Sequence, residues 1–364
     1  MDASEARREF LMLHEIVSAA RARLDQNMWD YVAGGTETET TLLRNRRSLD
    51  KLAFRPRVLR DVSRIDHSHD FFGRRIRLPI LLAPVGGLEA IGEGGGLAVA
   101  RAAGAFGVPF VLSSASQPEL EEVGAAATSQ RVYQLYARGG PEFIDDHARR
   151  AIKSGYDAFC LTVDTALYSR RERDMVNRFD KPWRRRLTGM EHQAKLSWAD
   201  VARFKATHGI KLILKGIATR EDAELACDHE VEAIYVSNHG GRQLDHGRGS
   251  MDVLPEIVAA VAGRARIIVD GGFYRGSDIV KAVALGADLV GLGRIYCYGL
   301  AAAGEVGIIR VLELLEAEVI ECLGLLGVTS LAELCPSHLC ASDAVTQPHL
   351  LSAFPLLDPA ARTG

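Results

Sequence analysis

The sequence predicts an α/β protein built on a (β/α)8 TIM barrel, and two observations support this fold class. From residue 76 onward, short apolar or β-branched runs alternate with alanine-rich helical stretches, a pattern typical of a parallel sheet. There are eight such runs, which is the number that closes a barrel without a second domain. The runs cover residues 78–84, 108–114, 131–136, 157–164, 211–216, 233–238, 266–272 and 288–293.

The segments outside this repeat have recognisable roles. Residues 1–75 predict a helical and irregular lead-in, with a helix that ends in a glycine turn at "MWDYVAGGTETE". Residues 165–197 interrupt the alternation after the fourth strand, on the active face of a barrel, and are a candidate lid. Residues 301–326 predict a long closing helix. In residues 327–364, "PHLLSAFPLLDP" is too apolar for a solvated end, so we expect it to pack on the barrel or on a neighbouring subunit.

Length and composition indicate one globular domain, residues 1–364, with the barrel at 76–326. The chain is 47% hydrophobic and 25% charged, and its net charge of -3 gives no electrostatic reason to expect nucleic acid. The basic run "KPWRRR" is interpreted as a solvated loop. The first residues lack the apolar core of a secretory signal, and no apolar run is long enough to span a bilayer. The six cysteines include no CxxC pair, so we expect reduced thiols, no metal site and a cytoplasmic protein.

Nearly every predicted strand ends in polar or glycine residues. In a parallel barrel these ends open onto one face, where active sites are built. Each residue taken alone fits a cap or a turn, but together they predict one site. The strand-end residues are Ser113, Ser114, Gln134, Tyr136, Thr162, Asp164, Lys215, Ser237, Asn238, His239, Asp270, Gly271, Gly272, Gly293 and Arg294.

The loops after the seventh and eighth strands, "DGGFYRGSD" and "GLGRIY", predict a phosphate site. Such loops bind phosphate through glycine N–H groups and the start of a short helix. Gly271, Gly272 and Gly293 allow a close approach of the backbone, and Arg275 or Arg294 can meet a dianion through a planar fork. Two adjacent glycine-rich loops with arginines favour phosphate over a plain turn.

The motif "SNHGGRQLD" predicts an acid/base centre that handles an anion. His239 is the candidate base because imidazole titrates near neutral pH, and Asp164 can orient it. Arg242 offers the bidentate cation that a substrate carboxylate needs. Lys215 would point a positive charge into the same opening of the barrel. If the phosphate is that of a flavin, this charge would stabilise the reduced flavin. An ordinary polar loop and a lysine that reaches solvent are the alternatives at this point.

Several motifs together resemble a known family. "LILKGI", "SNHGGRQLD", "LTVDT" with "RRERDMVNRF", "DGGFYRGSDIVKAVALGAD" and "GLGR" are similar to those of the FMN-dependent α-hydroxy acid oxidases and dehydrogenases, such as glycolate oxidase, lactate oxidase and mandelate dehydrogenase. The resemblance runs from about Met28 to Gly324. It implies oxidation of an (S)-2-hydroxy acid to the 2-oxo acid with FMN, and oxygen or another electron acceptor. It also implies a homotetramer or other homo-oligomer.

The resemblance assigns roles to individual residues. His239 would take the substrate proton, with Asp164 behind it, and whether that proton leaves carbon or oxygen stays open. Catalysis would also involve Tyr136 and Lys215. The substrate would be held by Tyr31, Tyr136, Arg171 and Arg242. FMN would be held by Pro84, Val85, Gly86, Ser113, Gln134, Thr162, Lys215, Ser237, Asp270, Gly271, Gly272, Arg275, Gly293 and Arg294.

The sequence departs from the family pattern in four places. Ala115 replaces the tryptophan of glycolate oxidases, which implies a roomier pocket and a substrate with a bulky or aromatic side chain. Gly86 replaces an alanine typical of oxidases and leaves oxidase, monooxygenase and dehydrogenase open. Tyr274 holds the arginine position of the "DGGxR" pattern, with Arg275 one place later. The insertion after "NRF" is short and lacks a membrane-binding segment, so no membrane partner is expected.

Two other functions fit parts of the pattern. One is a flavin-dependent isomerase similar to isopentenyl diphosphate isomerases, which share the phosphate loops. The other is a non-catalytic FMN-binding barrel. Tyr31 and "SNHGGRQLD" favour carboxylate handling over a diphosphate, and His239 with Arg242 favours catalysis.

Overall fold

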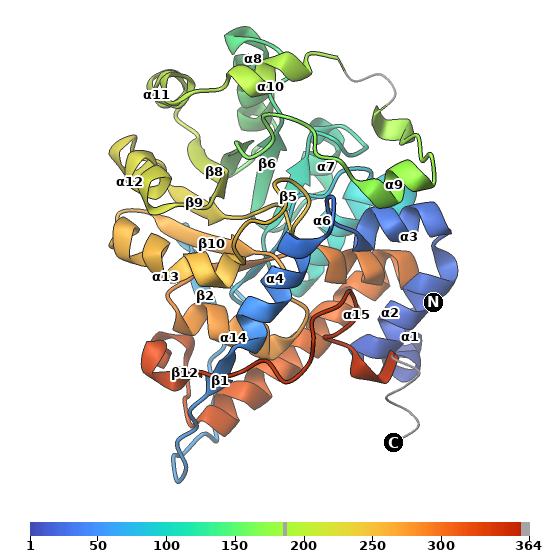
Figure 1. Ribbon diagram of the computed structural model, residues 1–364, viewed down its shortest axis with the longest axis vertical. Coiled ribbons are helices and arrows are strands. Elements are labelled where there is room, and N and C mark those ends of the chain that lie inside the picture. Colours follow the sequence, from blue (N-terminus) through green and yellow to red (C-terminus); the bar gives the residue numbers. More distant parts are fainter. Residues whose placement is uncertain (185–187, 358–364) are drawn as a thin grey trace.

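The computed structural model describes residues 1–184 and 188–357, and its centre is a closed barrel of eight parallel strands (Figure 1). Each strand pairs with the next along the chain, and the last pairs with the first. Every strand overlaps one of the predicted runs, which confirms the fold class. The strands are β4 (Ile80–Leu82), β5 (Phe110–Ser113), β6 (Arg131–Leu135), β7 (Ala158–Thr162), β8 (Lys211–Ile217), β9 (Ala233–Val236), β10 (Arg266–Asp270) and β11 (Leu289–Leu292).

The barrel strands are buried on both sides, which explains their continuous apolar character. Their outward side chains pack in one cluster with the surrounding helices. Their inward side chains form a second cluster that fills the barrel, so the interior is a packed core and not a pore. Members of the inner cluster include Leu81, Val111, Val132, Cys160, Ile213, Tyr235, Ile268 and Leu289.

A helix follows each strand and covers the outside of the barrel (Figure 1). In the helix after β6, Ile144, Ala148 and Ala151 form a buried stripe, and Pro141 occupies the first turn. The covering helices are α6 (Gly95–Phe106, after the short α5, Leu88–Ile91), α7 (Leu120–Ala126), α8 (Pro141–Lys153), α11 (Trp198–Thr207), α12 (Arg220–Asp228), α13 (Ser250–Val261), α14 (Gly276–Ala284) and α15 (Arg294–Leu326).

The lead-in contains the expected helices and three short strands that the sequence did not predict. The strands β2 and β3 form an antiparallel hairpin, and Phe71 and Ile76 of this hairpin pack into the inner cluster. The amide of Gln130, just before β6, donates to the carbonyl of Phe71, so the hairpin closes the amino end of the barrel. The elements are α1 (Ala3–Glu9), α2 (Leu13–Arg23), α3 (Gln26–Ala33), α4 (Thr40–Asp50), β1 (Leu52–Phe54), β2 (His69–Phe71) and β3 (Arg74–Ile76).

The closing helix and the C-terminal segment pack against the barrel. Helix α15 starts earlier than predicted, and its backbone leaves helical geometry at Ala303 and Gly304, so only its second part matches the predicted helix. The segment beyond it contains η2 (Leu331–Glu333), η3 (Pro336–His338), β12 (Leu339–Ala341), which pairs with β1, and η4 (Pro355–Leu357). Phe354 is fully buried, with its ring centroid 5.5 Å from that of Tyr274. We expected this segment to pack either on the barrel or on a neighbouring subunit, and the described residues pack on the barrel.

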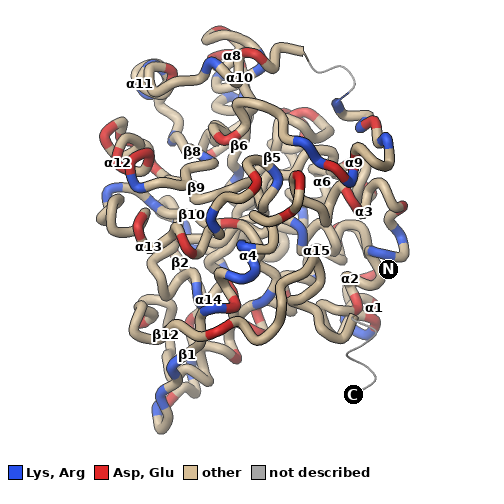
Figure 2. Tube along the Cα trace, viewed as in Figure 1, with Lys and Arg blue, Asp and Glu red and all other residues tan. Residues whose placement is uncertain are grey.

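The insertion after β7 lies at the carboxyl end of the barrel. It forms α9 (Glu172–Val176), η1 (Pro182–Arg184) and α10 (Met190–Lys195), and residues 185–187 lie outside the described part. Helix α9 packs against α3, and Arg173 of α9 pairs with Asp30 and Glu39. In Figure 2, acidic and basic residues are interspersed along the visible trace. Within the described ranges, no helix has both the length and the apolar character that a bilayer span requires.

Candidate active site

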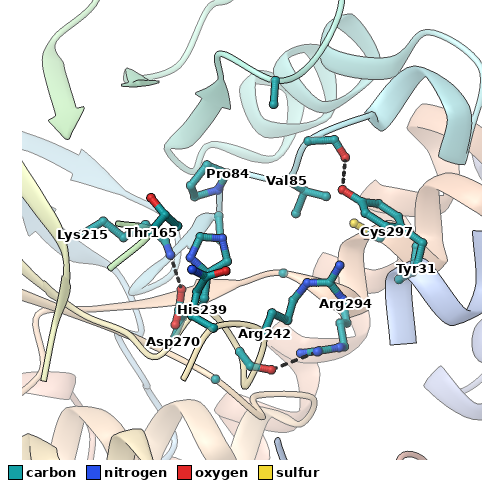
Figure 3. Close-up of a pocket in the computed structure, with 18 of the residues that line it drawn as sticks. Tyr31, Pro84, Val85, Thr165, Lys215, His239, Arg242, Asp270, Arg294 and Cys297 are labelled. Atoms are coloured by element: carbon teal, nitrogen blue, oxygen red, sulfur yellow. Dashed lines mark hydrogen bonds and ion pairs between the residues drawn. The ribbon is translucent and has the colours of Figure 1, made fainter. Parts of the chain in front are cut away.

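A cavity opens at the carboxyl ends of the barrel strands, and strand-end loops, α3 and the insertion line it. The structure brings segments as distant as α3 and the start of α15 to this one space. Figure 3 shows His239, Arg242, Pro84 and Val85 facing it. The lining residues that the sequence predicted are Tyr31, Pro84, Val85, Gly86, Tyr136, Arg171, Lys215, His239, Arg242, Asp270, Gly271, Gly272, Gly293 and Arg294.

The remaining predicted polar residues lie at the strand ends just behind this lining. The Oγ of Ser113 donates to Oε1 of Gln134 over 2.8 Å. The Nε2 of Gln134 and the Oγ1 of Thr162 are buried and have no hydrogen-bond partner among the described residues. Because unsatisfied buried polar atoms cost free energy, these two atoms at the ends of adjacent strands indicate that a polar ligand completes the site.

Arg275 is the predicted cofactor residue that the structure places elsewhere. It precedes the first turn of α14, and its Nη2 lies 2.6 Å from Oε1 of Glu318 on α15, outside the cavity lining. Tyr274 takes the lining position instead. We expected Arg275 to face the cavity, but the ion pair with Glu318 holds it against the outer helix.

Arg294 keeps a position suited to phosphate. Its guanidinium donates to the carbonyls of Gly34 and Gly240 over 2.8 and 2.9 Å, which fixes it in the cavity wall. A Cβ added to Gly293 would meet no described atom within 4 Å, so the backbone there faces open space. Gly271 and Gly272 both have positive φ, which favours glycine in this loop.

Lys215 is a buried, hydrogen-bonded cation and not a lysine that reaches solvent. Its side chain is 3% exposed, and its Nζ lies 3.0 Å from Oγ of Ser237 and 3.7 Å from Oδ2 of Asp270. Burial alone would lower the pKa of Lys215, but the carboxylates of Asp270 and Asp164 raise it above the ordinary value. The ammonium group is therefore a permanent positive charge at the end of β8.

His239 lies between a carboxylate and a phenol. Its Nδ1 is 3.1 and 3.2 Å from the two oxygens of Asp164, and its Nε2 is 3.2 Å from the hydroxyl of Tyr136. The residue adopts a φ of 60°, and its backbone N–H donates to Oγ of Ser237. This turn holds the ring in one orientation, with Asp164 behind it and the cavity in front.

The electrostatics favour a neutral His239 and an ionised Asp164. Burial is the main cause that lowers the pKa of His239, and Lys215 lowers it further, while Asp164 opposes both. Burial alone would raise the pKa of Asp164, but His239 and Lys215 hold it below its usual value. With Nδ1 donating to Asp164, the Nε2 of neutral His239 is available to accept a proton. Burial raises the pKa of Tyr136 to about 12, so its hydroxyl stays protonated.

Two guanidinium groups form an anion site beside this base. Nη1 of Arg242 donates to the carbonyl of Gly34 over 2.8 Å, and its guanidinium carbon lies 5.0 Å from the ring centroid of Tyr31. Burial and the nearby Arg171 lower the pKa of Arg242 to about 10, so it stays charged at neutral pH. The Nε of Arg171 is buried without a hydrogen-bond partner, and within the described ranges no carboxylate pairs with either arginine. A substrate carboxylate would fill this gap.

Comparison with known proteins identifies the family. The model of the FMN-dependent dehydrogenase family matches residues 20–341. The chain belongs to this family. Glycolate oxidase 1 of Zea mays is 37% identical over 369 residues, which cover 95% of this chain and 99% of the relative. A peroxisomal (S)-2-hydroxy-acid oxidase of Oryza sativa subsp. japonica is 38% identical over 346 residues, covering 90% and 94%. The crystal structure of mandelate oxidase with (S)-2-phenylpropionate has a TM-score of 0.86 at 39% identity and covers 93% of this chain and all of that one.

Membership confirms the resemblance, the enzyme class and the cofactor inferred from the sequence. This member of the FMN-dependent dehydrogenase family is an oxidoreductase of the 2-hydroxy acid oxidase and dehydrogenase class. Bound FMN supplies a two-electron acceptor. The unpaired atoms of Gln134 and Thr162 would bond its polar edges, and Lys215 would lie close to the ring. Gly293 and Arg294 would hold its phosphate.

Sequence reasoning missed two residues of α4 that stabilise the site of this FMN-dependent dehydrogenase family member. Asn45 exchanges two amide hydrogen bonds, of 2.8 and 2.7 Å, with Asn238 in the His239 loop. Arg46 donates to the carbonyl of Gly272 and pairs with Asp278 over 2.7 Å. Both lie in the lead-in, where no strand-end pattern marks them.

The second group that was missed comes from loops above the cavity. The basic run "KPWRRR" was interpreted as a solvated loop, and this was wrong for its first part: Lys181 is 8% exposed, and Trp183 and Arg184 line the cavity. Arg185 and Arg186 lie outside the described residues. Tyr168 and Arg138 also line the cavity.

The pH dependence of FMN reduction tests the roles of His239 and Asp164. Because the neutral imidazole is the base, the rate should fall as the pH drops through the pKa of His239. Asp164 is the group that raises this pKa, so Asp164→Asn should shift the acidic limb to lower pH. We also expect a maximal rate roughly 10- to 100-fold lower, because the ring loses its orienting partner. Anaerobic stopped-flow measurements across pH check this.

The control is Asp252→Asn, an exposed residue outside the cavity lining, whose carboxylate pairs with Lys51. It should keep the original profile. An acidic limb that does not move in Asp164→Asn would show that Asp164 does not set the protonation of His239.

Proposed function

We propose that the protein oxidises an (S)-2-hydroxy acid with a bulky or aromatic side chain to the corresponding 2-oxo acid. The observation that supports this most is the grouping of a neutral base, His239, with two guanidinium groups, Arg171 and Arg242, that pair with no carboxylate of the described residues. The arginines would hold the α-carboxylate, with the hydroxyls of Tyr31 and Tyr136 nearby. The Nε2 of His239 would then take the substrate proton.

The residues of the cavity wall favour a substrate with a bulky or aromatic side chain. Ala115 and Gly86 add little volume to the wall. Trp183 of the insertion lies over Gly87, because a Cβ added to Gly87 would be 2.6 Å from the indole ring. The ring centroids of Trp183 and Tyr31 are 4.8 Å apart. These aromatic faces can pack against an apolar ring. The structural similarity to mandelate oxidase is consistent with this choice.

An anaerobic screen of hydroxy acids tests the proposal. We expect acids with an aromatic side chain to bleach the flavin absorbance faster than glycolate or lactate. Admitting air then measures the rate at which the colour returns, which separates an oxidase from a dehydrogenase, and a decarboxylated product identifies a monooxygenase. Failure of every 2-hydroxy acid to bleach bound FMN would overturn the proposal in favour of a non-catalytic barrel.

The substitution Ala115→Trp tests the size of the pocket. The indole would occupy space that the side chain of the substrate needs, so the specificity constant for an aromatic hydroxy acid should fall about 10- to 100-fold relative to that for glycolate. Ala115→Ser is the matched control, because it adds a single oxygen. A parallel fall for both acids would show that Ala115 does not border the substrate side chain.

Two further parts of the proposal concern the environment of the protein. We expect a cytoplasmic location and a homotetramer or other homo-oligomer. All six cysteines are free in the structure, which supports a reducing compartment. Cell fractionation and light scattering of the purified protein measure the two properties directly.

A further inference from the structure

Two arginines that line the cavity have no role in the site described above. Arg138 follows β6, and Arg184 ends the η1 turn of the insertion. The Nε of Arg138 is buried and makes no hydrogen bond, and in the described part of the chain no carboxylate pairs with Arg138 or Arg184. The guanidinium carbon of Arg184 lies 3.4 Å from the ring centroid of Tyr168, which places its charge against that aromatic face.

The charges around the cavity do not balance. Asp270 is the one carboxylate among the described lining residues, and it already pairs with Lys215. The phosphate of FMN matches Arg294, and an α-carboxylate matches Arg171 and Arg242. Two positive charges remain. The lining cations are Arg138, Arg171, Arg184, Lys215, Arg242 and Arg294.

The protonation of neighbouring groups supports an unbalanced positive field. Burial alone would raise the pKa of the Tyr168 phenol, yet nearby cations hold it below the ordinary value. Burial lowers the pKa of Arg138, and the positive charge of Arg184 lowers it further. Arg138 and Arg184 thus repel each other with no anion of the described chain between them. The cations around Tyr168 are Arg171, Arg184, Lys181 and Arg242.

We infer that the substrate carries a second carboxylate at the far end of its side chain, bound by Arg138 and Arg184. This inference rests on the proposed function and specifies its substrate class: an (S)-2-hydroxy acid whose bulky side chain ends in an anion. Both arginines are half-buried, and partial burial of a cation without a counterion costs free energy, which a ligand carboxylate would offset through charge-assisted hydrogen bonds. A substrate without this group would leave Arg138 and Arg184 unpaired and bind less tightly.

A pair of substrates that differ only in this group tests the inference. Mandelate and 4-carboxymandelate share the reacting carbon and the ring, and the second adds one carboxylate. We expect anaerobic flavin reduction to be about 10- to 100-fold more efficient with 4-carboxymandelate, the gain of one charge-assisted contact. Arg138→Gln and Arg184→Gln should each lower this preference by roughly tenfold. Arg149→Gln on α8, a 66% exposed side chain, is the matched control and should keep it.

A binding measurement gives a readout without turnover. The oxidised products, benzoylformate and 4-carboxybenzoylformate, should each perturb the flavin spectrum on binding. We expect the lower dissociation constant for 4-carboxybenzoylformate, and Arg138→Gln should reduce the difference between the two constants. Equal efficiency of mandelate and 4-carboxymandelate would overturn the inference and leave the proposed function standing. If no 2-hydroxy acid reduces the flavin, the proposed function and the inference both fail. A preference that survives both arginine substitutions would overturn the assignment to Arg138 and Arg184.

Discussion

In His239→Ala, FMN should stay bound while its reduction by substrate slows about 100- to 10,000-fold. The imidazole contacts Asp164 and Tyr136, whereas Gln134, Thr162, Lys215 and Arg294, which are suited to hold FMN, lie at the ends of other strands. The neighbouring Ser237 bonds only the backbone N–H of His239, which the substitution keeps. Removing the imidazole therefore removes the proton acceptor and leaves the cofactor contacts in place. The visible spectrum measures bound FMN, and anaerobic stopped-flow mixing measures its reduction.

His246→Ala is the control for this experiment. His246 lies in the same loop and is exposed, so its loss should change neither quantity. If His239→Ala lost FMN and activity to the same extent, the histidine would be mainly a structural residue of the loop.

Arg242→Ala should lower the specificity constant for a 2-hydroxy acid by about 3 kcal/mol, or roughly 100-fold. The buried guanidinium has a pKa of about 10 and is charged at neutral pH, so its removal leaves the α-carboxylate facing Arg171 alone. Most of the loss should appear as weaker binding of substrate and of unreactive 2-oxo acids. Added guanidinium ion should restore part of the activity, because the vacated space lies in the cavity wall.

The comparison for Arg242→Ala is Arg248→Ala, six residues along the same segment. Arg248 is exposed and pairs with Glu256, so its loss should leave the specificity constant unchanged. Unchanged affinity for 2-oxo acids in Arg242→Ala would show that this arginine does not bind the carboxylate.

The barrel could be predicted because each of its strands carries its own local signal. A short buried run between turn residues and an amphipathic helix is visible without knowing its neighbours. The strands β1, β2 and β3 were missed because each has three residues and forms only when a distant segment pairs with it or accepts its side chains. Phe71, for example, is buried only because the barrel interior receives it.

The same distinction separates the predicted from the missed site residues. His239, Arg242 and Lys215 follow strands, and the geometry of a parallel barrel sends all strand ends to one rim. Trp183 and Arg184 lie on an insertion whose orientation depends on long-range contacts, such as the 2.6 Å ion pair of Arg173 with Glu39. Arg275 was misplaced for a related reason, because its partner Glu318 is more than forty residues away. Local patterns do not contain such pairings.

The packing of Phe354 on Tyr274 bears on when the enzyme acquires its cofactor. Tyr274 borders the cavity beside the glycine loop, and the residue that backs it is made after all eight strands. During translation the barrel can therefore assemble while the cavity wall at Tyr274 still lacks its support. Stable capture of FMN should therefore follow the release of the C-terminal segment from the ribosome.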